Sequence, residues 1–222
     1  GVINMPKEVI KKAIEKNFDY HESVDSEVWD TIQGGQQPKI TLITCSDSRV
    51  SGHIFGKDMI NHEFHIRNIG NQIENNFGSV DYGINHLHTP ILLILGHTDC
   101  GAVKASQSDF SGESDEIKKE LYPLYFNLRL VSKNTDMGSH ADVTKLVQEN
   151  VDLQVKDAIK RYTTEGQYVV GAIFDIHSQL GDKPGRVIIT NINGETDIEE
   201  LKEHPLLSDL ESSMKSVVVN RV

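Results

Sequence analysis

Two short polar segments, each placed directly behind a run of apolar residues, constrain this chain more than any other feature. Residues 45–49 (CSDSR) follow the run at 39–44 (KITLIT), and residues 97–100 (HTDC) follow the run at 91–95 (ILLIL) and one glycine. Both runs have the length and composition of buried strands. The two cysteines of the chain lie in these segments. Two thiolates and one imidazole suit a single Zn²⁺, and three protein ligands leave a fourth position for water, as in catalytic zinc sites.

Length and composition exclude several classes of protein. A chain of 222 residues with 37% hydrophobic and 25% charged residues is typical of one globular domain. The net charge of −11 argues against nucleic acid as a partner, because phosphate binding needs a basic patch. The longest apolar run, 90–96, is too short to cross a bilayer. No signal peptide is evident, so we expect a cytoplasmic protein without membrane contact; since the chain begins with glycine, removal of a leader stays an open alternative.

The first part of the chain predicts two helices and no strand. Residues 5–19 carry apolar side chains at helical spacing, and residues 23–32 read as a second short helix that ends at two glycines. We expect residues 1–35 to form a helical arm that packs on a partner subunit. The whole chain, 1–222, is expected to be a single domain.

Strands and helices alternate along the rest of the chain. Strands are expected at 39–44, 63–67, 91–95, 168–175 and 186–190, and helices at 78–88, 101–107, 117–131, 142–162 and from 198 onward. This alternation predicts an α/β fold with a central, mainly parallel β-sheet flanked by helices. Both polar segments then begin at the carboxyl ends of strands, where open parallel sheets bind ligands.

The paired motifs resemble those of the β-class carbonic anhydrases. CSDSR followed by GHTDCGA carries most of the likeness, and residues 36–39 (QQPK), 64–71 (FHIRNIGN) and 81–87 (DYGINHL) resemble the plant-type branch of that family. The resemblance covers about residues 30–176. It implies reversible hydration of carbon dioxide to hydrogencarbonate and a proton, by attack of hydroxide bound to zinc. It also implies a homodimer, with dimers that can pair into tetramers.

The resemblance also assigns residues to the site. It implies one Zn²⁺ per chain, and it pairs Asp47 with Arg49 beside the metal. The implied zinc ligands are Cys45, His97 and Cys100. The residues that match the substrate pocket, some contributed by the neighbouring subunit, are Gln36, Phe64, Ile69, Tyr82 and Gly101. Tyr82 and His86 match a pair that helps to move protons to solvent, and their spacing of four places them on one helix face.

The chemistry of the residues gives Asp47 a specific task. Two thiolates neutralise Zn²⁺ and weaken its pull on bound water, so a nearby group must accept a hydrogen bond from the hydroxide. Asp47 is placed for this, and Arg49 can hold it by a bidentate ion pair. Relatives with a regulatory hydrogencarbonate pocket carry Trp three residues before the first ligand, where this chain has Leu42. We therefore expect the open form, with Asp47 paired to Arg49.

Other interpretations remain open at this stage. Relatives of this fold hydrolyse carbonyl sulfide or carbon disulfide with the same three ligands, and a non-catalytic zinc-binding subunit is a third alternative. Asp99 lies between two ligands and is expected to be structural or solvent-facing. No catalytic part is expected for the histidines that lie near the motifs in sequence, His53, His62, His65 and His88.

Overall fold

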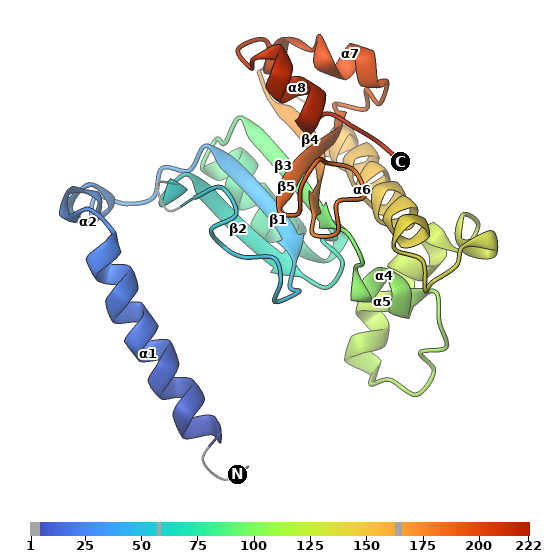
Figure 1. The fold of residues 1–222 in the computed structure, drawn as a ribbon, viewed down its shortest axis with the longest axis horizontal. Helices are drawn as coiled ribbons and strands as arrows, with labels where there is room; N and C mark the ends of the chain where they lie inside the picture. The colour runs from blue at the N-terminus through green and yellow to red at the C-terminus, as the bar shows by residue number, and fades with distance from the viewer. Residues whose placement is uncertain (1–4, 57–58, 163–165) are drawn as a thin grey trace.

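The computed structural model describes residues 5–56, 59–162 and 166–222. A single five-stranded sheet has the order β2-β1-β3-β4-β5 (Figure 1). Its strands are β1 (Ile40–Cys45), β2 (Glu63–Asn68), β3 (Ile91–His97), β4 (Tyr168–Asp175) and β5 (Arg186–Ile192). The first four strands run parallel, and β5 pairs antiparallel with β4. This confirms the predicted α/β fold with a mainly parallel sheet.

Helices cover both faces of the sheet, and the apolar side chains form one cluster on each face. Because successive side chains of a strand point to opposite faces, Ile43 joins one cluster and Leu42 the other. The first cluster contains much of α6 (His140–Tyr162), and the second contains Leu201 and Leu207 from the C-terminal region. The helices of the central part are α3 (Phe77–Asp81), α4 (Gly101–Ser106), α5 (Asp115–Leu128) and α6 (His140–Tyr162).

Two glycines let α6 approach the sheet closely beside the end of β3. A Cβ on Gly96 would lie 2.9 Å from Val151 Cγ2, and a Cβ on Gly171 would lie 2.8 Å from Val151 Cγ1. Real Cβ atoms do not make such short contacts, so larger residues would push α6 away. This close packing sets the position of the chain just before His97.

The predicted helix at 78–88 is divided into different helical types. A 3₁₀ turn, η3 (Glu74–Asn76), leads into α3, and a π-helical turn, η4 (Tyr82–His86), follows. Gly83 in this π turn packs directly on β1, because a Cβ there would lie 2.1 Å from Thr41 Oγ1. The segment is therefore helical as expected, but its winding changes where it meets the sheet.

The N-terminal arm consists of α1 (Met5–Ser23) and α2 (Ser26–Ile32), and α1 projects away from the rest of the chain (Figure 1). No residue of α1 is buried, and Val9, Ile14 and Phe18 are 62%, 52% and 68% exposed. The helix predicted over 5–19 is present and extends to Ser23. An apolar stripe without a partner is typical of a surface that binds another molecule.

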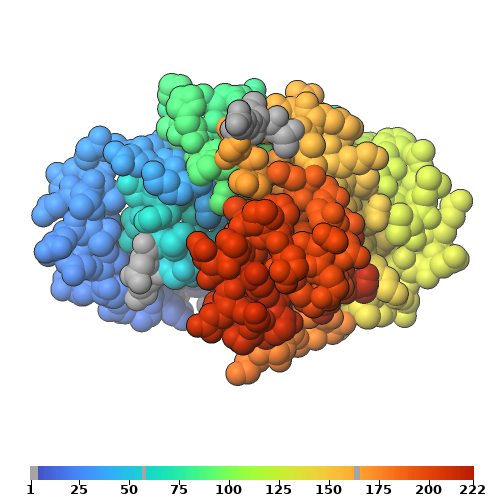
Figure 2. Space-filling view, turned by 90° about the horizontal axis from the view of Figure 1, so that it is seen from above, coloured from blue at the N-terminus to red at the C-terminus, as the bar shows by residue number. Residues whose placement is uncertain are grey.

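The C-terminal region packs back on the body of the protein and covers the middle of the face seen in Figure 2. It contains α7 (Ile198–Lys202), η6 (Pro205–Leu207) and α8 (Ser212–Val218). Arg221 Nη2 lies 2.6 Å from Asp152 Oδ2, which ties the end of the chain to α6. Among the helices described in the structure, none is long and apolar enough to cross a bilayer.

Candidate metal centre and active site

Neighbouring strands bring the three predicted metal ligands together. Cys45 is the last residue of β1 and His97 the last residue of β3, and these strands pair in parallel. Cys100 follows on the turn that leads into α4. The two Sγ atoms lie 4.0 Å apart, and one candidate ligand atom from each residue lies within 4.8 Å of the others. All three side chains are buried.

The residues present fit a zinc ion. Both cysteines are free thiols. The Nδ1 atom of His97 lies 3.1 Å from the carbonyl oxygen of Thr98, whereas Nε2 is buried and has no hydrogen-bond partner within the described part of the chain. A proton on Nδ1 leaves the Nε2 lone pair free for a metal, and a backbone carbonyl is a usual partner for a metal-binding histidine. Two sulfurs and one nitrogen are ligands that zinc prefers.

The two thiols titrate as a pair. Hydrogen bonding with Cys100 lowers the pKa of Cys45, and His97 adds to this effect although burial opposes it. The same bond, together with burial, raises the pKa of Cys100. One thiolate is therefore favoured without a metal, and a bound cation would displace the second proton.

Asp47 and Arg49 form a bidentate ion pair at the edge of this cluster. Arg49 donates from Nε to Asp47 Oδ1 at 3.0 Å and from Nη2 to Asp47 Oδ2 at 2.8 Å. The hydrogen bonds from Arg49 hold the pKa of Asp47 well below its usual range, although burial opposes the shift. Asp47 Oδ2 also lies 3.7 Å from His97 Nε2. An ionised carboxylate thus stands beside the candidate metal position, as the open form requires.

Further contacts around this pair were not predicted from the sequence. Arg67 donates to the carbonyl oxygens of Cys45 and Asp47, at 3.3 and 3.0 Å, and so supports the turn after β1. Arg49 also contacts Asp99, both at its backbone oxygen and at its carboxylate. Asp99 is therefore structural rather than solvent-facing. The FHIRNIGN segment drew attention to Arg67 in the sequence. However, that motif alone does not predict that Arg67 on β2 contacts the end of β1.

A pocket of about 370 Å³ opens beside the cluster. Ile69 and Gly101, two of the residues that the resemblance assigns to the substrate pocket, line it together with Cys45 and Asp47. Side chains that sequence reasoning missed complete its wall: Ala102, Ala105, Glu113, Ile117 and Leu121. Ile117 and Leu121 come from α5, so the packing of this helix against α4 was needed to identify them.

The remaining predicted residues do not line this pocket. The ring of Phe64 on β2 stacks on Tyr82 at 5.7 Å between centroids, and Tyr82 lies 4.4 Å from His86. Tyr82 is 44% exposed, and Gln36 lies in the exposed loop before β1. The predicted site residues therefore form two separate groups within one chain.

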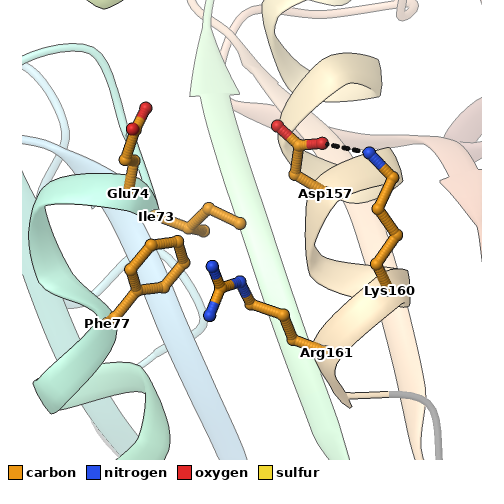
Figure 3. Close-up of a pocket in the computed structure, with 6 residues that line it drawn as sticks. All are labelled: Ile73, Glu74, Phe77, Asp157, Lys160 and Arg161. Carbon is orange, nitrogen blue, oxygen red and sulfur yellow. Dashed lines mark hydrogen bonds and ion pairs between the residues drawn. The ribbon is translucent and has the colours of Figure 1, made fainter.

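A second pocket lies between η3, α3 and the end of α6 (Figure 3). The guanidinium of Arg161 stacks on the ring of Phe77 at 3.9 Å, and Lys160 pairs with Asp157 at 2.8 Å. The only ion pair marked among the residues drawn joins Asp157 and Lys160, and none of the predicted site residues lines this pocket. It therefore gives no competing candidate for the active site.

Comparison with known proteins shows which protein family this chain matches. Residues 40–182 match the family model described as carbonic anhydrase. A carbonic anhydrase of Mycolicibacterium smegmatis is 38% identical over 74 residues, which cover 33% of this chain and 36% of that protein. A β-carbonic anhydrase of Aspergillus fumigatus has a TM-score of 0.68 at 23% identity, covering 87% of this chain and 95% of that structure. One of two tetrameric β-carbonic anhydrases of Sordaria macrospora has a TM-score of 0.61 at 23% identity, covering 84% and 96%. The last two share the fold.

Proposed function

Because the chain belongs to the carbonic anhydrase family, we propose that it catalyses the reversible hydration of carbon dioxide to hydrogencarbonate and a proton. The observation that carries this proposal is the buried Cys45, His97 and Cys100 cluster with the ionised Asp47 beside it. Whether the chain belongs to the plant-type branch stays a prediction.

Cys45, His97 and Cys100 would hold one Zn²⁺. The metal would supply a Lewis acid that makes water a nucleophile near neutral pH. The orphaned Nε2 of His97 and the two free thiols support this assignment.

Asp47 and Arg49 would control protons at the site. Asp47 accepts a hydrogen bond from the attacking water, and Arg49 keeps that carboxylate ionised and turned toward the guanidinium. Asp47 Oδ2 lies 3.7 Å from His97 Nε2. Without the pairing to Arg49, the carboxylate could turn toward His97 and bind the metal itself. The pair therefore supplies the acceptor for the hydrogen bond from water, and it also prevents Asp47 from binding the metal and inhibiting the enzyme.

The pocket suits a small molecule without charge. Ile69, Ile117 and Leu121 offer an apolar wall next to Cys45 and Asp47. Carbon dioxide has neither a net charge nor a dipole, so an apolar wall binds it without a polar group left unpaired. Gly101 leaves room beside the cluster, since a Cβ at this position would have no described neighbour within 4 Å.

A homodimer would complete the site. Gln36, Phe64 and Tyr82 of one subunit would face the pocket of its partner, which explains why they lie apart from it within one chain. The arm at 1–35 would pack on that partner through the exposed stripe of α1, as part of a single domain 1–222. Dimers could pair further, and the Sordaria relative is described as tetrameric.

Tyr82 and His86 would carry protons to solvent. Their rings lie 4.4 Å apart and both residues are exposed. Histidine is a common proton carrier in enzymes. The pair lies on η4, next to Phe64, so a shared site would bring it near the partner's pocket.

A stopped-flow assay of carbon dioxide hydration, run with metal analysis on the same preparation, tests the proposal. We expect zinc at about one per chain and activity that a chelator removes and added zinc restores. Hydrogen sulfide release from carbonyl sulfide or carbon disulfide, without carbon dioxide hydration, would support the hydrolase alternative. Bound zinc without any of these activities would support a non-catalytic subunit.

A further inference from the structure

The guanidinium of Arg49 is held by two carboxylate residues rather than one. Its Nε and Nη2 atoms donate to Asp47. On the other side Nη2 donates to the backbone oxygen of Asp99 at 3.1 Å, and Nη1 donates to Asp99 Oδ2 at 3.4 Å. Arg49 therefore bridges the turn that follows Cys45 at the end of β1 and the turn between His97, at the end of β3, and Cys100.

Asp99 is itself fixed from several elements. Lys104 on α4 donates from Nζ to Asp99 Oδ1 at 2.8 Å, and His140 Nδ1 at the start of α6 lies 3.5 Å from the same oxygen. The ring of His177 stacks on His140 at 4.3 Å. Burial alone would raise the pKa of Asp99, but the bonds from Lys104 and Arg49 lower it, so the carboxylate is ionised.

The backbone at Asp99 restricts which residue can stand there. Its φ of 57° lies in the left-handed region, which aspartate and asparagine adopt more readily than most other side chains. This conformation occurs in the short turn between His97 and Cys100, whose ligand atoms lie within 4.8 Å of each other. Aspartate meets the backbone requirement and supplies the charge that Arg49 contacts.

We propose that Asp99 is a positioning residue that holds Arg49, and through it Asp47, in the orientation that keeps Asp47 off the metal. This inference rests on the proposed function, because it assigns Asp99 a task in that reaction. Asp99 links the two segments that carry the metal ligands, and it acts through Arg49 without touching substrate.

The same cluster is a poor second metal site. Ligand atoms of Asp99, His140 and His177 lie within 4.8 Å of one another. However, Lys104 and Arg49 already neutralise Asp99, and a divalent cation would be repelled by both. The contacts therefore favour a role toward Arg49 over cation binding.

NMR of protein labelled with ¹⁵N-arginine tests the contact without any assay of activity. The rotation rate of the Arg49 guanidinium is measured in the metal-free and zinc-loaded forms of the wild type and of Asp99→Asn, which keeps the backbone preference and removes the charge. Loss of one charge-assisted hydrogen bond should speed rotation about tenfold. Asp182→Asn is the control, because Asp182 pairs with Arg186 in an exposed pair that shares no residue with the pocket. An unchanged rotation rate in Asp99→Asn would overturn the proposal.

A double-mutant cycle on carbon dioxide hydration tests whether Asp99 acts through Arg49. Asp99→Asn should lower kcat/KM about tenfold in the wild type but much less in Arg49→Ala, at unchanged zinc content. Equal losses in both backgrounds would mean an independent structural role and would refute the inference. If the wild type shows no hydration activity, the proposed function fails, and the NMR measurement alone then decides whether Asp99 holds Arg49.

Discussion

Asp47 Oδ2 lies 3.7 Å from His97 Nε2, within reach of the candidate metal position, yet the same oxygen accepts a hydrogen bond from Arg49 at 2.8 Å. The carboxylate therefore stands between the guanidinium and the candidate metal position. Which partner it takes depends on how firmly Arg49 is held. A conservative substitution of Arg49 can therefore test what this ion pair contributes to the site.

Arg49→Lys should lower kcat/KM for carbon dioxide hydration by about 10- to 100-fold while zinc content stays unchanged. Lysine keeps the charge but cannot make the two parallel bonds that the guanidinium makes to Asp47. Stopped-flow kinetics and metal analysis on one preparation measure both quantities. The exposed neighbour Ser48 offers the control Ser48→Ala, which should behave like the wild type. Full activity of Arg49→Lys would show that the bidentate geometry is unimportant.

Removal of one sulfur should abolish tight zinc binding. In Cys100→Ser the cluster keeps Cys45 and His97, which are too few protein ligands for a zinc site of this type. For the wild type we expect zinc affinity to fall as the pH is lowered, because both thiols must lose their protons to bind. Equilibrium dialysis against zinc over a series of pH values measures both effects. Retention of one zinc per chain by Cys100→Ser would contradict the assigned ligand set.

A shared site predicts that two inactive variants restore each other. Asp47→Ala and Gln36→Ala damage opposite halves of the proposed site, so a mixed dimer contains one undamaged site. Random mixing by refolding should recover about a quarter of wild-type activity. Each variant refolded alone is the control and should remain inactive. Recovery that does not exceed these controls would mean that Gln36 does not act across subunits.

Much of the fold follows from local patterns, whereas the site depends on pairing between distant segments. Periodicity located the strands, and the two motifs at strand ends located Cys45 and His97, because parallel strands bring their carboxyl ends to one edge. The contacts of Asp99 with Arg49 and the wall from α5 join residues far apart in the chain. Single-sequence patterns carry no signal for such contacts. The π turn at Tyr82–His86 was missed for a similar reason, because it lies where Gly83 closely approaches Thr41 on β1.

Gly83→Ala should destabilise the protein by about 3 kcal/mol, at the upper end of the cost of an overpacked core. Its new methyl group would lie 2.1 Å from Thr41 Oγ1, which is buried and already bonded to Thr89. Gly78→Ala is the matched control in the preceding helix, where a Cβ meets nothing within 4 Å. That variant should be neutral or slightly more stable, because alanine favours helix. Urea denaturation compares the three proteins, and similar stability of both variants would refute the close packing.

Tyr162→Phe should reduce the free energy of unfolding by about 1 kcal/mol at neutral pH. Tyr162 Oη donates to Asp81 Oδ1 at 2.7 Å and so ties the end of α6 to the segment that carries Tyr82 and His86. Burial, together with the bond to Asp81, raises the pKa of Tyr162 well above its ordinary value. The hydroxyl therefore stays protonated in the folded protein at pH values where it ionises in the unfolded chain.

This shift fixes the sign of the pH dependence. Below about pH 10, the ordinary pKa of tyrosine, the contribution of Tyr162 is fully present. Above that pH the unfolded chain loses the proton and the folded protein keeps it, so the stability of the wild type falls as pH rises. The difference between wild type and Tyr162→Phe should therefore shrink as the pH rises from about 10 to 11. Urea denaturation at several pH values measures this difference, with Tyr122→Phe, which removes an exposed phenol, as the control. A difference that stays constant across this range would show that Asp81 does not hold the Tyr162 proton.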